Sequence, residues 1–264
     1  MSGFDWLLCP QCGDGLVVED RAARCDRGHS VDRARQGYLN LLGRAQGANA
    51  DTPDMVARRH AFLSSGHYSP IADAVSQRSS GSAAVVEVGA GTGWYLARVL
   101  DALPSAEGLG VDVSVAAARR LAKCHPRARA IVADAWQPLP IASAVADVML
   151  SIFAPRNPED FARVLGPKGR LVVVTPRADH LREARERFGL LGIEADKQQR
   201  LASTLGPWFT ETEAEDLDVP MVLAPGELVN LVGMGPNAFH DHSADVQEPF
   251  EVTARVRISS WQKR

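Results

Sequence analysis

The sequence predicts an α/β fold in which an open, doubly wound sheet carries helices on both faces and follows a small metal-binding module. Three observations support this. Val85 to Val88 is a short β-branched run that ends in a glycine-rich turn, and apolar residues at helical spacing follow it. Two later apolar runs each end in an aspartate, as alternating strands and helices would require. Three of the four cysteines lie between Cys9 and Cys25.

Size and composition limit the classes of protein. A chain of 264 residues can bury one large core and add a small module. No apolar run approaches the roughly 18 residues of a membrane span, and residues 1–5 lack the basic start of a signal peptide. We therefore expect a cytoplasmic protein without a membrane partner. The net charge of −3 excludes a molecule that is basic all over, but six arginines lie between Arg21 and Arg44 against two acids. They predict either a basic contact surface or ordinary solvated surface.

The N-terminal cysteines have the spacing of a metal site. Cys9 and Cys12 form one pair, and Cys25 and His29 form another after twelve residues that fit a hairpin at 16–18 and 24–25. Three thiolates and one imidazole make a closed tetrahedral set, which is typical of structural rather than catalytic zinc. A disulfide is the alternative, but it leaves one thiol over and needs an oxidising compartment. Cys124, on a predicted helix, is expected to be a packing residue.

The central turn reads Glu87-x-Gly89-x-Gly91-Thr92-Gly93, and its glycines would let the backbone approach a ligand closely. The third glycine comes one residue early for the dinucleotide fingerprint, and no Gly-Lys-Ser/Thr follows, which excludes a P-loop. A turn with only a structural role remains the alternative.

The other elements follow from periodicity and punctuation. Residues 43–53 lose apolar content and are expected to be a mobile connection, and Asp51 or Thr52 would cap the helix after them. Predicted helices are 54–64, 71–77, 95–103, a helix capped by Ser114 that runs through Cys124, 161–166 ending at a glycine, and 179–191. Predicted strands are 85–88, 109–112, 128–134, 145–152 and 169–176, with late strands at 219–223 and 252–258 and acidic loops between these two.

Further motifs are specific to one family. Asp32-x-Ala34-x-x-Gly37-Tyr38-x-Asn40-Leu41-Leu42 follows the metal knuckles, and Ala57-Arg58-Arg59-x-x-Phe62-Leu63-x-x-Gly66-His67-Tyr68-x-Pro70 precedes the glycine turn. Together they resemble the bacterial 23S rRNA (guanine-N1)-methyltransferases, which include tylosin-resistance enzymes. The resemblance covers nearly the whole chain. It implies a class I methyltransferase (Rossmann-like) fold, S-adenosyl-L-methionine and zinc as cofactors, a 23S rRNA hairpin as partner, and a homodimer whose two modules form one RNA cleft.

The site residues come from the turn and from this resemblance. Asp112 ends the second strand about 20 residues beyond the glycines, where an acid accepts hydrogen bonds from ribose hydroxyls. Asp134 resembles the acid that faces the adenine amino group, and His180 resembles a position beside the cofactor. Asp112 and Asp134 could instead be ordinary strand-end turn residues. The expected cofactor-binding set is Tyr68, Glu87, Gly89, Gly91, Thr92, Gly93, Asp112, Asp134 and His180.

The sequence identifies no catalytic base: Asp134, Asp179 and His180 are candidates only. Residues 153–158 lack the Asp/Asn-Pro-Pro-Tyr of exocyclic-amine methylation, and no nucleophilic cysteine is near, which argues for a ring nitrogen, an oxygen or a small-molecule acceptor. The predicted domains are a zinc-binding RNA-recognition module (1–45), a linker and helix (46–70) and the methyltransferase domain (71–264). The favoured function is methylation of guanine N1 in a 23S rRNA hairpin loop. A small-molecule methyltransferase and a non-catalytic RNA-binding protein are the alternatives.

Overall fold

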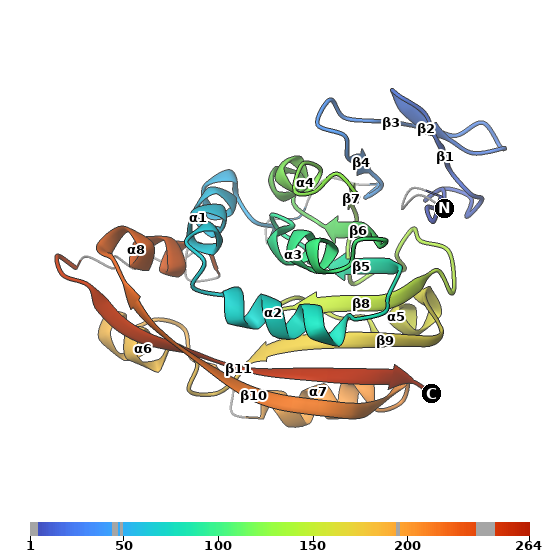
Figure 1. The fold of residues 1–264 in the computed structure, drawn as a ribbon. Coiled ribbons are helices and arrows are strands. Elements are labelled where there is room, and N and C mark those ends of the chain that lie inside the picture. The colour runs from blue at the N-terminus through green and yellow to red at the C-terminus, as the bar shows by residue number, and fades with distance from the viewer. Residues whose placement is uncertain (1–4, 44–46, 48–49, 194–195, 236–245) are drawn as a thin grey trace.

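The computed structural model describes residues 5–43, 47, 50–193, 196–235 and 246–264, which form a small sheet and a large one (Figure 1). The large sheet has the strand order β10-β11-β9-β8-β5-β6-β7-β4. Strands β4 to β9 pair in parallel, whereas β11 and β10 are antiparallel additions at one edge. The strand bounds are β4 Leu39–Asn40, β5 Ala84–Val88, β6 Glu107–Asp112, β7 Ala128–Val132, β8 Ala146–Ile152, β9 Leu165–Pro176, β10 Phe209–Leu223 and β11 Phe250–Lys263. The predicted doubly wound fold is confirmed.

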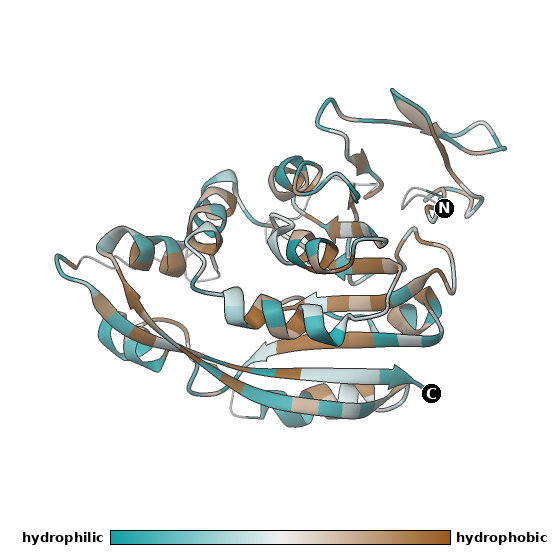
Figure 2. Ribbon diagram, viewed as in Figure 1, coloured by the Kyte–Doolittle hydropathy of each residue, from teal (hydrophilic) through white to brown (hydrophobic). Residues whose placement is uncertain are grey.

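Helices cover both faces of this sheet, because its inner strands are apolar on both sides. Val85 of β5 packs into one core and its neighbour Val86 into the other. Figure 2 shows apolar residues running along β8 and β9, whereas β10 carries long polar stretches. The helix bounds are α1 Pro53–Ser64, α2 Ser69–Arg78, α3 Trp94–Ala102, α4 Val115–Leu121, α5 Pro158–Val164, α6 Arg182–Phe188, α7 Lys197–Leu205 and α8 Pro225–Gly233. Among the described residues, none of these helices is long and apolar enough to cross a membrane.

The N-terminal module is a three-stranded antiparallel sheet of β1 (Val17–Val18), β2 (Ala22–Arg24) and β3 (Ser30–Asp32), which confirms the predicted hairpin. Its continuation, β4, leaves this sheet and pairs with β7 of the large one. Trp6 and Leu7 are buried in the core that also contains α5 and α7. The module is therefore packed onto the large sheet, and its last strand extends that sheet.

Some predicted boundaries were wrong, mostly near the C-terminal edge. Strands β10 and β11 are much longer than the predicted 219–223 and 252–258. The acidic run Glu211 to Asp218 is itself part of β10, and β11 extends along it to Lys263. An edge strand can expose acids on its solvent side, and here neighbouring arginines pair with several of them. These pairs are Arg257 with Glu211 at 3.1 Å, Arg78 with Glu215 at 2.8 Å and Arg177 with Asp218 at 2.7 Å. Part of the segment expected as acidic loop is helix α8.

Other helix ends also differ from the prediction. Helix α5 ends at Val164, so strand β9 begins before the glycine that was expected to close the helix. Helix α4 is capped by Ser114, as predicted, but ends at Leu121. Helix α6 is shorter than 179–191. Of the two proposed caps of α1, it is the Thr52 side chain that accepts from Met55 N, at 3.3 Å. Residues 44–46 and 48–49 of the connection expected to be mobile, 43–53, lie outside the described residues.

Candidate functional site

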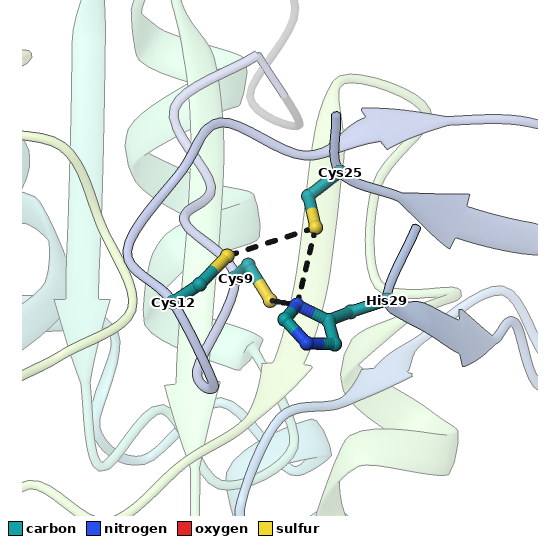
Figure 3. Close-up of side chains that lie close together, drawn as sticks. All are labelled: Cys9, Cys12, Cys25 and His29. Atoms are coloured by element: carbon teal, nitrogen blue, oxygen red, sulfur yellow. Dashed lines mark hydrogen bonds between the residues drawn. The ribbon is translucent and has the colours of Figure 1, made fainter. Parts of the chain in front are cut away.

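The four predicted zinc ligands converge at one point (Figure 3). Nδ1 of His29 lies 3.6 Å from Sγ of Cys9 and 3.4 Å from Sγ of Cys25, and the sulfurs of Cys12 and Cys25 are 3.7 Å apart. A tetrahedral zinc with ordinary Zn–S and Zn–N bonds requires about 3.8 Å between two sulfurs and about 3.6 Å between sulfur and nitrogen. The donor set and its spacing therefore fit a closed structural zinc site.

Two glycine turns build this site. Gly13 N donates to the carbonyl of Cys9 at 2.8 Å, and Gly28 N donates to that of Cys25 at 2.9 Å. Both glycines have positive φ, +79° and +84°, which other residues adopt only at a cost. Each turn folds its segment back, so that the two pairs of ligands face each other.

A second site lies at the carboxyl ends of the parallel strands, where open α/β sheets bind their ligands. It is a cavity of about 530 Å³, within the usual range for a small-molecule site. Its lining includes six of the nine residues expected to bind the cofactor: Tyr68, Glu87, Gly89, Gly91, Asp112 and Asp134. Thr92 and Gly93 continue the same turn, and His180 lies outside the lining but beside Phe153, which is part of it.

The three glycines of the turn have positive φ (+69°, +56° and +77°) and three different neighbours. A Cβ on Gly89 would lie 2.5 Å from Cβ of Ala154, in the loop after β8. A Cβ on Gly93 would lie 2.6 Å from Sγ of Cys124, so this glycine lets α3 and the end of α4 approach each other. The space over Gly91 is the least crowded of the three: a Cβ there would lie 3.4 Å from the side chain of Arg59, which lines the cavity.

Two buried acidic residues accept hydrogen bonds from the backbone of the glycine turn and of the helices beside it. Asp112 accepts from Gly91 N and from Ser114 N, both at 2.8 Å, and thus joins the turn to the start of α4. Glu87 accepts from Leu96 N at 3.0 Å in the first turn of α3. Burial raises the pKa of Asp112, and it raises the pKa of Glu87 to about 8. The side chain of Glu87 therefore supports helix α3, in addition to lining the cavity.

An ion pair covers the cavity above Gly91. Arg59 of α1 pairs with Asp51, and its Nη2 donates to the carbonyl of Met234 at 2.6 Å. The carbonyl of Asp51 accepts from Oγ of Ser114 at 2.7 Å. Among the described residues, Arg59 is the only lysine, arginine or histidine that lines the cavity. The cavity thus offers one cation among several carboxylates.

Two buried hydroxyls of the glycine turn and the start of α3, Oγ1 of Thr92 and Oη of Tyr95, are among the side-chain atoms without a partner in the described part of the chain. Tyr95 lines the cavity. Unpartnered buried hydroxyls cost free energy, so they favour a polar ligand at this site. A polar ligand with an amino-acid end, a ribose and a base, such as S-adenosyl-L-methionine, fits a cavity with this mixture of cation, acids and hydroxyls.

The three candidate proton acceptors lie in different surroundings. Asp134 lines the cavity, and its Oδ1 accepts from Trp136 N at 3.0 Å. His180 is buried before helix α6, with Nδ1 3.1 Å from the backbone nitrogen of Arg255. Burial lowers the pKa of His180 to about 4, so it is neutral at neutral pH. Asp179 pairs with Arg177 and Arg255, each at 3.5 Å, and does not line the cavity.

Sequence reasoning missed the cavity residues Arg59, Trp136 and Phe153 as parts of this site. Arg59 was predicted only as part of the family motif, since nothing local links α1 to the glycine turn. Phe153 directly follows β8 and Trp136 lies four residues after the end of β7, and their side chains are 41% and 66% exposed. An aromatic residue just beyond a strand end is the signal that could have identified both.

A smaller hollow of about 310 Å³ lies between the N-terminal module and the large sheet. Arg33 lines it together with Lys123 and Arg129, and Nε of Arg33 donates to the carbonyl of Gly37 at 3.3 Å. Elsewhere on the module, Arg27 pairs with Asp14 at 2.8 Å and Arg24 with Glu19 at 3.6 Å. Acidic residues thus offset part of the basic run, whereas Arg33 borders a basic hollow.

The N-terminal module and the large sheet each match a model of a known protein family. Residues 7–46 match a zinc-ribbon family model described as "RlmA, N-terminal", and residues 85–169 match a methyltransferase domain model. The solved structures of the YcgJ protein from Bacillus subtilis and of a putative methyltransferase from Haloferax volcanii, in complex with the Trm112 activator, share the fold. The YcgJ match has a TM-score of 0.52 at 16% sequence identity and covers 73% of this chain and 97% of YcgJ. The Haloferax volcanii match has a TM-score of 0.53 at 15% identity and covers 82% of this chain and 99% of that chain.

Curated relatives match over nearly the full length. A Streptomyces fradiae protein named 23S rRNA (guanine(748)-N(1))-methyltransferase is 44% identical over 95% of this chain and 90% of its own. A putative 23S rRNA (guanine-N(1)-)-methyltransferase from Micromonospora griseorubida is 43% identical over 97% of this chain and 96% of its own. The zinc ribbon, the methyltransferase fold and this level of identity place the chain in the family of 23S rRNA (guanine-N1)-methyltransferases.

Proposed function

We propose that this protein transfers the methyl group of S-adenosyl-L-methionine to N1 of a guanine in a 23S rRNA hairpin loop. One observation carries the proposal: a cavity built on the glycine turn and two strand-end acids occurs in the same chain as a Cys₃His module. The relatives at 43–44% identity are named for methylation of a guanine N1 in 23S rRNA. When bound, S-adenosyl-L-methionine supplies an electrophilic methyl group on its sulfonium sulfur.

The chain's own residues bind and orient the reactants. We propose that the turn from Gly89 to Gly93 holds the amino-acid end of the cofactor, that Asp112 receives the ribose hydroxyls and that Asp134 faces the adenine. Tyr68, Glu87 and His180 complete the predicted set. In-line displacement needs aligned reactants rather than a covalent enzyme intermediate, and alignment can lower the barrier by up to roughly 7–11 kcal/mol.

The acceptor nitrogen imposes two conditions. N1 lies on the Watson–Crick edge of guanine, so the target base must be unpaired or flipped out of its stack. N1 also carries a proton at neutral pH, which must leave before or during attack. Of the three candidate acceptors, Asp134 lines the cavity, His180 is a weak base because burial lowers its pKa to about 4, and Asp179 is engaged by two arginines.

The zinc module would contribute to RNA binding rather than to chemistry. Cys9, Cys12, Cys25 and His29 would all be engaged by the metal, so no coordination position is left for a substrate. The adjoining residues Arg33 and Arg35 would contact phosphates. The family resemblance also suggests a homodimer with one RNA cleft. Sedimentation of the purified protein tests whether it is a dimer.

Mass mapping of 23S rRNA tests the function. Cells that contain the protein should carry one additional N1-methylguanine in a hairpin loop, and purified protein should add it to rRNA extracted from cells that lack the protein. A small-molecule methyltransferase would leave the rRNA unchanged, and a non-catalytic binding protein would bind the rRNA without methylating it. Tylosin susceptibility of the same two cell lines tests the resistance role.

A further inference from the structure

We propose that Phe153 is the stacking surface for the target base, so that the flipped guanine lies against its ring during methyl transfer. This inference rests on the proposed function and assigns the acceptor side of the same cavity. Phe153 directly follows β8 and lines the cavity, yet its side chain is 41% exposed. An exposed aromatic ring at the rim of a cavity favours a stacking partner, because burying it there gains free energy.

The backbone of Phe153 is strained. Its φ of +53° is left-handed, a conformation that is disfavoured for a non-glycine residue. Three non-glycine residues among those described have positive φ, and the other two are Ala144 and Leu181. Leu181 directly follows His180, whose ring is 5.9 Å from that of Phe153. Two of the three strained positions therefore lie at one place, and such strain concentrates at functional sites.

Contacts on both sides keep this conformation in place. Phe153 N donates to the carbonyl of Val174 in β9 at 3.0 Å. Next to it, Ala154 packs against Gly89 so closely that a Cβ on the glycine would be 2.5 Å away. The absence of a side chain at Gly89 thus lets the loop after β8 press onto the glycine turn. The loop is fixed with the Phe153 ring at the cavity rim.

The order of strands places this ring on the acceptor side. The proposed ribose and adenine contacts, Asp112 and Asp134, follow β6 and β7, and β8 lies on the other side of β5. A cofactor with its adenine at the β7 end therefore directs its sulfonium end toward β8 and Phe153. The ring also lies 6.3 Å from the ring of Tyr68. A purine entering here meets the rings of Phe153 and Tyr68, which come from two separate segments of the chain.

The test compares three variants of Phe153 with wild type. The substrate is a 23S rRNA fragment that contains the target hairpin without the methyl group. F153G removes the ring but suits the left-handed backbone, F153L keeps apolar bulk without a π face, and F153W keeps an aromatic ring. W208A is the matched control: Trp208 is 40% exposed but lines a different hollow. Methyl transfer by wild type to this RNA tests the proposed function by itself, and if wild type transfers none, function and inference both fail.

With active wild type, F153G and F153L should each lower kcat/KM for RNA by about ten- to a hundredfold, the usual worth of one stacked base. F153W should stay within about threefold of wild type, as should W208A. The dissociation constant of S-adenosyl-L-methionine, measured by calorimetry, should change less than about twofold in all four variants. Wild-type kcat/KM in F153G or F153L would overturn the inference while leaving the proposed function intact. An equal loss of cofactor affinity in F153G would also overturn it, since the ring would then serve the cofactor.

Discussion

The zinc site and the cofactor cavity are assembled in opposite ways. All four zinc ligands come from one segment, between Cys9 and His29, and two glycine turns bring them together. The cavity draws its lining from segments as far apart as Gly47 and Met234, which meet only after the sheet has formed. Spacing along the chain therefore specifies the first site, whereas the second depends on strand order. Substitutions should have local effects at the first site and distributed effects at the second.

The largest expected effect tests the local site. Cys12→Ala should abolish zinc binding, because three remaining ligands do not close a tetrahedral set. Structural zinc in small modules contributes about 10–16 kcal/mol of folding free energy, so the region before β4 should become sensitive to protease. Elemental analysis and limited proteolysis measure both results. C124A is the matched control, since Cys124 lies outside the cluster; one zinc in C12A would contradict the assignment.

The next effect tests the distributed site. Gly91→Val should weaken binding of S-adenosyl-L-methionine by at least about a hundredfold, because valine is disfavoured at φ +56° and its side chain would meet Arg59 over the cavity. Calorimetry measures this affinity. G189V is the control for strain alone, since Gly189 has φ +62° and no heavy atom near its Cβ position. It should lose stability but not affinity, and wild-type affinity in G91V would remove the glycine turn from the site.

Proton linkage at Glu87 should give an intermediate effect. Its pKa is about 8 in the folded protein and about 4.5 when unfolded, so between these values the folded state holds a proton that the unfolded state has released. Glu87 therefore makes stability fall as pH rises from about 4.5 to about 8. E87Q keeps an acceptor for Leu96 N but cannot titrate. Denaturant unfolding at several pH values in this window should show a steeper decline for wild type than for E87Q; equal slopes would mean that Glu87 is ionised in the folded protein.

The smallest effect concerns RNA binding by the module. Replacing Arg33 and Arg35 with alanine should flatten the salt dependence of RNA binding by about 0.9 log units per tenfold salt for each lost phosphate contact. Zinc content and cofactor affinity should not change. Filter binding at several salt concentrations measures the slope, with R200A on helix α7 as the control. A wild-type slope in the double variant would show that these arginines are ordinary solvated surface.

The difference between local and distributed sites also explains which features could be predicted from the sequence. The four predicted zinc ligands and the strands from β5 to β9 follow from local spacing and apolar runs; the structure brings the four side chains together and confirms the strands. The acidic half of β10 gave no strand signal, because Glu211 to Asp218 form a strand through pairing with β11 rather than through their own propensity. The cover of the cavity was missed for a similar reason. Arg59 reaches Gly91 only because α1 folds back over the sheet, and no local pattern encodes that contact.

The pairing of β4 with β7 fixes the distance between the N-terminal module and the cofactor cavity. Leu39 is in register with Ile131 and Asn40 with Val132, two residues before Asp134. The module proposed to contact RNA and Asp134, proposed to face the adenine, are thus connected through the pairing of these two strands. An RNA bound at the module would place next to the methyl group the nucleotide whose distance from the bound segment equals the distance between module and cavity. We therefore expect the choice of guanine to depend on stem length, as on a molecular ruler, so that lengthening the stem by one base pair moves the methylated nucleotide.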